Sequence, residues 1–262
     1  MSYVFISGAT GGIGKAFSYA FAEKGFNLFL TGRSNEKLSA LKEEIYSLND
    51  KIDVLTFACD LTVIGDRAKM IAFIDQKEIK FRRIVNVAGV DTQKGFLDYT
   101  NEKLIFQIRV NVESAITLTH ALIKRRDKDL RILTVGSMSG ATPMPYFALY
   151  SATKSMLLNF FTSLHYELKS LGIKVTTVMP GGVYTRADVV EDIRRQGIWG
   201  KLSAKTPEFV AKKSIKANDK NKIKYIPGFF NKLLYLIIKI APKRLTLTFI
   251  LKRWKKQTKD AF

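Results

Sequence analysis

The stretch SGATGGIG, residues 7–14, places four glycines between a short apolar run and a helical pattern. The run before it, YVFIS (3–7), is β-branched and aromatic, which is typical of a strand. After it, Ile13, Phe17 and Phe21 recur at helical spacing. Free amides and the positive end of the dipole at a helix start bind anions, so the stretch predicts a phosphate-binding turn. The alternative interpretation is a tight turn without a ligand.

Beyond this turn, strand-like and helix-like segments alternate along the chain. Further strands are predicted at 27–31, 53–60, 82–89, 130–137 and 173–181, with a short last strand in IKYIPG (223–228). Helices are predicted at 35–48 (capped by Ser34 or Asn35), 64–79, 101–126 and 147–171. This alternation predicts an α/β fold, a Rossmann-like, doubly wound parallel sheet. No internal repeat or linker is visible, so we expect a single domain over 1–262.

The glycine spacing resembles the T-G-x-x-x-G-x-G loop of the short-chain dehydrogenase/reductase family, with Ser7 at the threonine position. Other family motifs follow in the same order, although Val87 replaces the second asparagine of N-N-A-G. They are CDLT (59–62), NVAG (86–89), RVNVESA (109–115), GSMSG (136–140), YSATK (150–154) and PGGVYT (180–185). The resemblance covers roughly residues 3–185, the expected core 1–185, and implies an oxidoreductase that uses a nicotinamide cofactor.

The resemblance also implies four catalytic residues. Tyr150 would exchange a proton with the substrate oxygen, and Ser137 would hold that oxygen by a hydrogen bond. Ser139 is the neighbouring alternative to Ser137. Lys154, one helical turn from Tyr150, would bind the nicotinamide ribose and lower the tyrosine pKa from its ordinary value of about 10. Asn111 would anchor a proton-relaying water, or else bend its helix through a side-chain hydrogen bond.

Cofactor-binding residues follow from the same motifs. They are Gly8, Thr10, Gly11, Gly12, Ile13, Gly14, Arg33, Ser34, Asp60, Leu61, Asn86, Ala88, Gly89, Tyr150, Lys154, Pro180, Gly181, Val183 and Thr185. After the second strand the chain carries Arg33 rather than an acid, and an arginine can pair with a 2′-phosphate. We therefore expect NADP(H) rather than NAD(H). His120 and His165 lack clustered ligand residues, so no metal site is predicted.

Charge and composition set the last part of the chain apart. The net charge is +20, and residues 201–262 hold 17 Lys or Arg against three acidic residues. A single cysteine, Cys59, excludes an internal disulfide, and the N-terminus has no secretory-signal pattern, so a cytoplasmic location is expected. The cations alternate with aliphatic runs and match no recognition motif, so nucleic acid is not an expected partner.

The substrate and the C-terminal region are less defined by sequence. Residues about 186–225 correspond to the family's variable substrate loop or lid, and about 226–262 to a basic, partly apolar helical extension. An apolar ketone or alcohol would suit a pocket lined by Met144, Tyr146, Phe147, Tyr184 and Trp199. Residues 228–262 would touch an anionic membrane with Trp254 at the interface, pack on the body, or form a dimer.

The family also implies a homo-oligomer through the helices at 101–126 and 147–171. The alternative function is a cofactor-binding regulatory protein attached through the basic tail.

Overall fold

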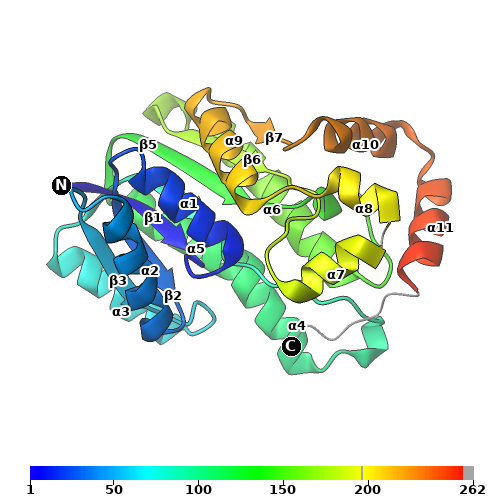
Figure 1. Cartoon of the computed structure of the whole chain (residues 1–262), viewed down its shortest axis with the longest axis horizontal. Coiled ribbons are helices and arrows are strands. Elements are labelled where there is room, and N and C mark those ends of the chain that lie inside the picture. The colour runs from blue at the N-terminus through cyan, green and yellow to red at the C-terminus, as the bar shows by residue number, and fades with distance from the viewer. Residues whose placement is uncertain (196, 256–262) are drawn as a thin grey trace.

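The computed structural model describes residues 1–195 and 197–255 (Figure 1). Seven parallel strands form one sheet in the order β3-β2-β1-β4-β5-β6-β7. The strands are β1 (Ser2–Ser7), β2 (Asn27–Gly32), β3 (Val54–Ala58), β4 (Lys80–Asn86), β5 (Arg126–Val135), β6 (Lys174–Val178) and β7 (Lys224–Tyr225). The order reverses beside β1, which confirms the predicted Rossmann-like, doubly wound sheet.

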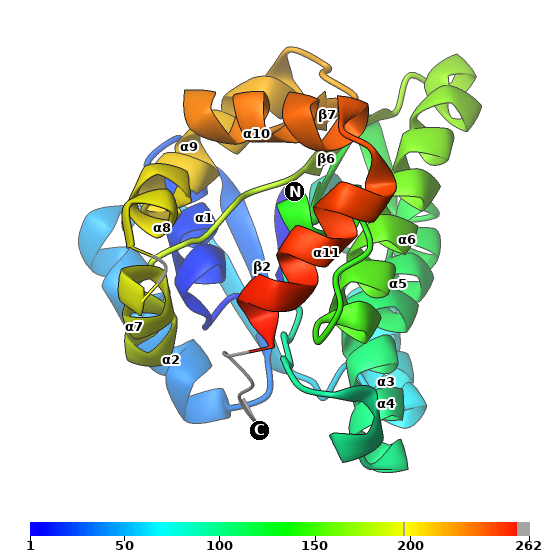
Figure 2. The same ribbon diagram turned by 90° about the vertical axis from the view of Figure 1, so that its right-hand side faces the viewer.

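Each face of the sheet is covered by its own helices, because side chains alternate along a strand. Val4 and Ile6 of β1 point into one buried cluster, whereas Tyr3 and Phe5 point into the other. The first cluster is completed by α1 (Gly12–Ala22), α2 (Asn35–Leu48) and α9 (Pro207–Asp219). The second is completed by α3 (Ile64–Gln76), α5 (Ser114–Ile123) and α6 (Ala148–Glu167). Figure 2 shows the two helix layers on either side of the sheet.

The predicted helix at 101–126 is interrupted. It consists of α4 (Asn101–Ile108), a π-helical turn (Arg109–Glu113) and α5. The predicted strands 82–89 and 130–137 also end early, at Asn86 and Val135. The residues beyond these ends leave the sheet as turns at its carboxyl edge, where ligands bind in open α/β sheets.

The region after β6 contains five helices with different surroundings. Three are α7 (Ala187–Arg195), α8 (Gly197–Ser203) and α9, and the last two are α10 (Phe229–Ile240) and α11 (Lys243–Trp254). Helix α9 buries Val210, Ala211 and Ile215, so it and β7 belong to the sheet core although they lie beyond residue 185. Helix α11 crosses the carboxyl edge of the sheet (Figure 2).

Parts of the predicted segments lie outside the described residues, namely residue 196 of the substrate loop and 256–262 of the extension. Among the helices that are described, none is both long enough and apolar enough to span a bilayer.

Candidate active site

Three glycines of the loop between β1 and α1, Gly8, Gly12 and Gly14, have little room for a larger side chain. Gly8 has a φ of +65°, and a Cβ on Gly14 would lie 2.1 Å from the Gly8 carbonyl oxygen. A Cβ on Gly12 would lie 3.1 Å from the side chain of Thr185, so the loop touches the predicted PGGVYT turn. Gly11 is the N-cap residue of α1 and supplies no side-chain cap. The first-turn amides can therefore bind a phosphate, and the cradle fits a dinucleotide.

The ends of β1 and β4 are tied together beside this loop. The Ser7 hydroxyl accepts hydrogen bonds from the amides of Val87 (3.1 Å) and Ala88 (3.3 Å). Asn86, by contrast, faces the core, where its amide group donates to the hydroxyls of Thr119 and Thr134. Its amide group is therefore used in the core, so the predicted cofactor contact would have to come from its backbone.

The ends of β2 and β3 carry the residues predicted to select the cofactor. Arg33 is exposed, and no carboxylate among the described residues pairs with it. The Ser34 hydroxyl caps α2 by accepting from the Lys37 amide and donates to Glu36 at 2.6 Å. Its predicted phosphate contact would therefore compete with Glu36. Asp60 accepts from the amide and hydroxyl of Thr62, which fixes the turn after β3.

The other predicted cofactor residues lie around the same edge. Thr10 sits over β2, where a Cβ on Gly32 would be 3.1 Å from its hydroxyl, and Leu61 is buried. The Pro180 carbonyl accepts from the Met138 amide at 2.9 Å, which joins the turn after β6 to the turn after β5. A Cβ on Gly181 would lie 2.9 Å from the Asn231 side chain of α10. The C-terminal extension is therefore packed directly on the predicted nicotinamide turn.

Tyr150, Lys154 and Ser137 come together at the start of α6. The Tyr150 side chain is hydrogen-bonded to Ser137, and the Lys154 ammonium lies 5.6 Å from the tyrosine ring centroid. Lys154 donates to the carbonyl of Val135 at 3.1 Å. Ser139 uses its amide to donate to the Ser137 hydroxyl. Of the two serines considered, Ser137 is thus the one that contacts the tyrosine.

The electrostatics of this group differ from the sequence expectation. Burial, followed by the charge of Asp91, raises the pKa of Tyr150 above its ordinary value, while the Ser137 hydrogen bond opposes this. Burial lowers the pKa of Lys154 to about 8, and Asp91 partly offsets that shift. The Tyr150 pKa is therefore raised rather than lowered as predicted, because desolvation and the charge of Asp91 outweigh the opposing hydrogen bond to Ser137.

Asn111 lies in the π-helical turn and clasps the backbone of Val90. Its Oδ1 accepts from the Val90 amide at 2.7 Å, and its Nδ2 donates to the Val90 carbonyl at 2.9 Å. Nδ2 also donates to the Thr153 hydroxyl at 3.1 Å. A Cβ on Gly89 would lie 3.2 Å from the Lys154 ammonium and 3.4 Å from Asn111 Oδ1. Asn111 therefore holds the NVAG turn against α6, a positioning role beside the predicted water relay.

Two features near the site, the charge of Asp91 and the contact of Trp254 with Phe147, were not predicted from the sequence. Asp91 acts on both Tyr150 and Lys154 and pairs with Arg186, at the start of the predicted lid, at 3.6 Å. The sequence feature that could have indicated Asp91 is its position directly after NVAGV (86–90), which contains a family motif. Trp254 of α11 stacks on Phe147 at 5.7 Å between ring centroids. No local pattern could have found that contact, because 107 positions separate the two rings in the chain.

The aromatic residues predicted to line the substrate pocket have different surroundings. Phe147 is buried, and its ring centroid lies 4.5 Å from that of Tyr150. Tyr146 beside it has a φ of +63°, a strained conformation of the kind found at binding sites. Trp199 is 59% exposed and packs on Phe230 of α10. Trp254 packs inward, which contradicts the predicted place of this side chain at a membrane interface.

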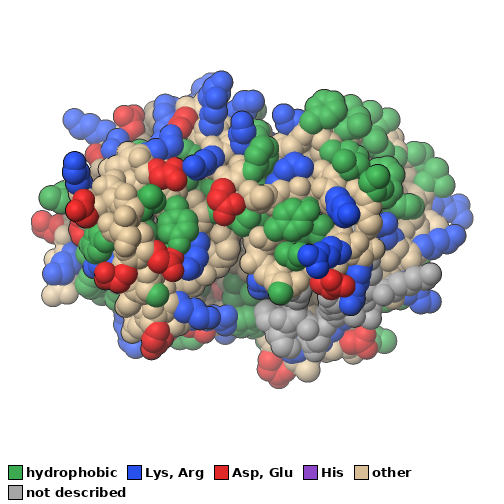
Figure 3. Space-filling view, viewed as in Figure 1, with side chains coloured by type: hydrophobic (Ala, Val, Ile, Leu, Met, Phe, Trp, Pro, Cys, Tyr) green, Lys and Arg blue, Asp and Glu red, His purple; other side chains and the backbone are tan. Residues whose placement is uncertain are grey.

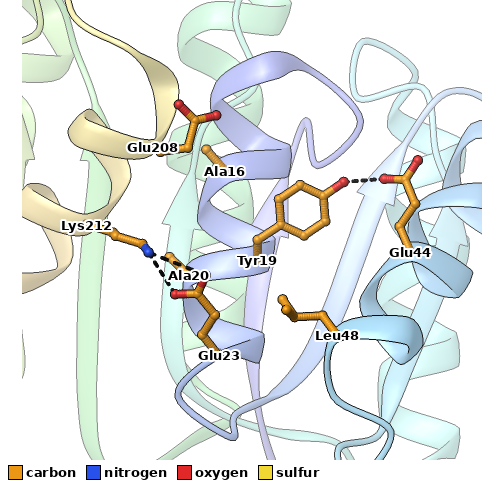
Figure 4. Close-up of a pocket in the computed structure, with 8 residues that line it drawn as sticks. All are labelled: Ala16, Tyr19, Ala20, Glu23, Glu44, Leu48, Glu208 and Lys212. Carbon is orange, nitrogen blue, oxygen red and sulfur yellow. Dashed lines mark hydrogen bonds and ion pairs between the residues drawn. The ribbon is translucent and has the colours of Figure 1, made fainter.

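A surface hollow on another part of the molecule has no such chemistry. It lies between the second half of α1, α2 and α9 (Figure 4). Two of its three carboxylates are already paired, Glu44 with Tyr19 and Glu23 with Lys212 at 2.9 Å. Within residues 1–195 and 197–255, no group of three His, Cys, Asp or Glu side chains is placed to hold a metal ion.

Comparison with known proteins assigns the family. Residues 2–196 match the short chain dehydrogenase family. Sulfoacetaldehyde reductase of Chromohalobacter salexigens is 32% identical over 191 residues, covering 71% of this chain and 74% of that protein. Very-long-chain 3-oxoacyl-CoA reductase of Aspergillus oryzae is 31% identical over 201 residues, covering 74% of this chain but only 56% of the fungal protein. The chain belongs to the short-chain dehydrogenase/reductase family and is an oxidoreductase acting on CH–OH or C=O groups.

Solved structures agree on the fold. One from work on 7β-hydroxysteroid dehydrogenase superposes with a TM-score of 0.85 at 23% identity, covering 95% of this chain and 96% of the other. A short chain dehydrogenase from Burkholderia cenocepacia in complex with NADP gives 0.76 at 20% identity, covering 88% and 98%. Members of this family bind NAD(H) or NADP(H).

Proposed function

We propose that this protein is an NADP(H)-dependent reductase of a fairly apolar ketone. The observation that carries the proposal is the juxtaposition of Tyr150, Ser137 and Lys154 beside a glycine loop that fits a pyrophosphate. The relatives' names range from sulfoacetaldehyde to very-long-chain 3-oxoacyl-CoA, so they do not select a substrate. The substrate class is inferred from the rings of Phe147 and Trp254 that lead to Tyr150.

The cofactor would be held by the chain's own residues as follows. The amides of the loop at Gly8–Gly14 bind the pyrophosphate, and the exposed guanidinium of Arg33 pairs with the 2′-phosphate. Lys154 donates to the nicotinamide ribose, in addition to its hydrogen bond to the Val135 carbonyl. When bound, the cofactor supplies the hydride that reduces the carbonyl carbon.

The proton would come from Tyr150. The hydroxyls of Ser137 and Tyr150 both donate to the substrate carbonyl oxygen, and the Tyr150 O–H bond breaks as negative charge develops on that oxygen. Burial raises the Tyr150 pKa, so its hydroxyl is protonated at neutral pH, as a proton donor requires. Lys154, with a pKa near 8, is mostly charged at pH 7 and stabilises the phenolate that remains.

The reaction is tested with ketones of increasing chain length, by following NADPH consumption. Tyr150→Phe is expected to lower kcat by about a hundredfold or more, the usual contribution of a general acid, while NADPH still binds. Turnover of Tyr150→Phe at the wild-type rate would refute the proposed proton donor. A wild-type preference for short polar aldehydes over apolar ketones would refute the substrate class.

We also infer a homo-oligomer formed through α4, α5 and α6. The apolar side chains of Ile105 and Ile108 on α4 and Met156 on α6 are between 43% and 52% exposed, and Tyr166 of α6 is 63% exposed. Exposed apolar faces of this kind are often covered by a second subunit. Light scattering on Met156→Glu is the test: the mass should fall to that of a monomer, whereas an unchanged mass would exclude this interface.

A further inference from the structure

The outer face of α10 carries a continuous stripe of exposed apolar side chains. They recur at positions i, i+4, i+7, i+8 and i+11, so they share one face of the helix. They are Phe229, Leu233, Leu236, Ile237 and Ile240, each between 45% and 83% exposed. Figure 3 shows hydrophobic side chains gathered over α10, with Lys and Arg side chains around them. Such a patch on a folded protein marks an interaction surface.

The opposite face of α10 is already packed on the body. Leu234, Tyr235 and Ile238 contact a buried cluster that includes Met138 and Met179. Asn231 donates to the carbonyls of Ser203 and Pro227, both at 2.8 Å. The helix is therefore fixed in place with its apolar stripe outward, and the described part of the chain leaves that stripe exposed.

Helix α11 adds a second exposed surface of the same chemistry. Leu245 and Phe249, one turn apart, are 67% and 66% exposed, whereas Ile250 is buried and Trp254 reaches Phe147 on the inner side. In both helices the inner face packs on the body of the protein, and large apolar side chains remain exposed on the outer face.

The charged side chains of the segment that carries these stripes all have one sign. Between residues 220 and 255 there are ten Lys or Arg and no Asp or Glu. Lys232 and Lys239 border the stripe of α10, and Lys243 and Arg244 are exposed in the first turn of α11. Two cations in a first turn oppose the helix dipole, so these side chains do not stabilise α11 itself. They would be stabilised by an anionic surface.

We propose that the outer faces of α10 and α11 dock on an anionic membrane surface. A symmetric contact with a second copy would bring the same cations face to face and is therefore disfavoured. A bilayer with anionic headgroups satisfies both observations, because acyl chains accept the apolar stripes and headgroups neutralise the lysines. This inference goes beyond the proposed reaction and does not depend on it.

The test is co-sedimentation of the full chain with lipid vesicles. Vesicles of phosphatidylcholine alone are compared with vesicles containing roughly one-third phosphatidylglycerol. The protein is expected to bind only the anionic vesicles, and less at high salt. Leu236→Ser/Ile240→Ser should lower the partition coefficient at least about tenfold. Lys243→Gln/Arg244→Gln should lower it about 25-fold, since each cation near such a surface contributes roughly fivefold.

Ile64→Ser is the control, because Ile64 of helix α3 is 67% exposed, between the values of 55% for Leu236 and 74% for Ile240. It should bind vesicles as the wild type does. NADPH binding is measured on each preparation, because a misfolded variant would lose it whereas a docking defect alone would not. The result for NADPH binding is independent of the result for vesicle binding. The proposal is overturned if the wild type ignores anionic vesicles, or if the α10 variant binds them unchanged. If the protein instead forms a dimer that the α10 variant disrupts, and does not bind vesicles, the surface is an interface with a second copy of the chain.

Discussion

Lys154→Met tests the electrostatic cost of the active site. Burial lowers the Lys154 pKa from 10.5 to about 8, so the unfolded chain holds this proton more tightly than the folded one. At 1.36 kcal/mol per pKa unit, the buried charge costs about 3 kcal/mol of stability below pH 8. The variant also loses the hydrogen bond to the Val135 carbonyl, worth about 1 kcal/mol. We therefore expect Lys154→Met to raise the free energy of unfolding at pH 7 by about 2 kcal/mol while abolishing activity.

The effect of Lys154→Met should depend on pH. Because the folded pKa is lowered, the destabilisation is complete below about pH 8 and disappears as the pH rises from about 8 to 10.5. The gain from Lys154→Met should shrink by about 2 kcal/mol between pH 7 and pH 9.5, as measured by urea unfolding followed by circular dichroism. Lys69→Met, at a side chain 78% exposed, is the control and should change stability little at either pH. A Lys154→Met variant less stable than wild type at pH 7, or a gain independent of pH, would refute the reasoning.

Three further substitutions test other parts of the site. Arg33→Asp should weaken NADPH binding at least about tenfold, or 1.4 kcal/mol, and leave NADH binding no weaker, in a fluorescence titration; unchanged NADPH affinity would exclude the phosphate contact. Asp91→Asn should lower the Lys154 pKa below 8, because Asp91 raises it, so that NADPH affinity declines at lower pH than in the wild type; an unshifted profile would contradict this coupling. Trp254→Ala should raise KM for an apolar ketone about fivefold with little change in NADPH affinity, since a stacked ring pair contributes about 1 kcal/mol; equal KM values would place α11 outside the substrate site.

Local signals predicted the sheet well. The apolar, β-branched and aromatic run at 3–7 predicted β1, and the alternation of strands with helices predicted the parallel, doubly wound sheet that the structure has. The motifs also brought the predicted Tyr150, Lys154 and Ser137 into one cluster. These features depend on near neighbours in the chain, and that is why a single sequence carries them.

Features that depend on long-range packing were beyond the sequence. The helix at 101–126 has no proline or glycine, yet it contains a π-helical turn where Asn111 clasps Val90. The Tyr150 pKa rises because the folded chain buries the ring, which no spacing between Tyr150 and Lys154 could reveal. The stacking of Trp254 on Phe147 likewise requires the path of the whole extension.

The most direct test of the central claim is an equilibrium titration of the protein with NADPH and with NADH, followed by fluorescence, because it needs no substrate. NADPH binding at least about tenfold tighter than NADH binding would support both the phosphate cradle at Gly8–Gly14 and the contact of Arg33 with the 2′-phosphate. Equal affinity for the two cofactors would exclude the proposed contact of Arg33 with the 2′-phosphate, but the protein would still be an oxidoreductase. A folded protein that binds neither would contradict the account of the glycine loop.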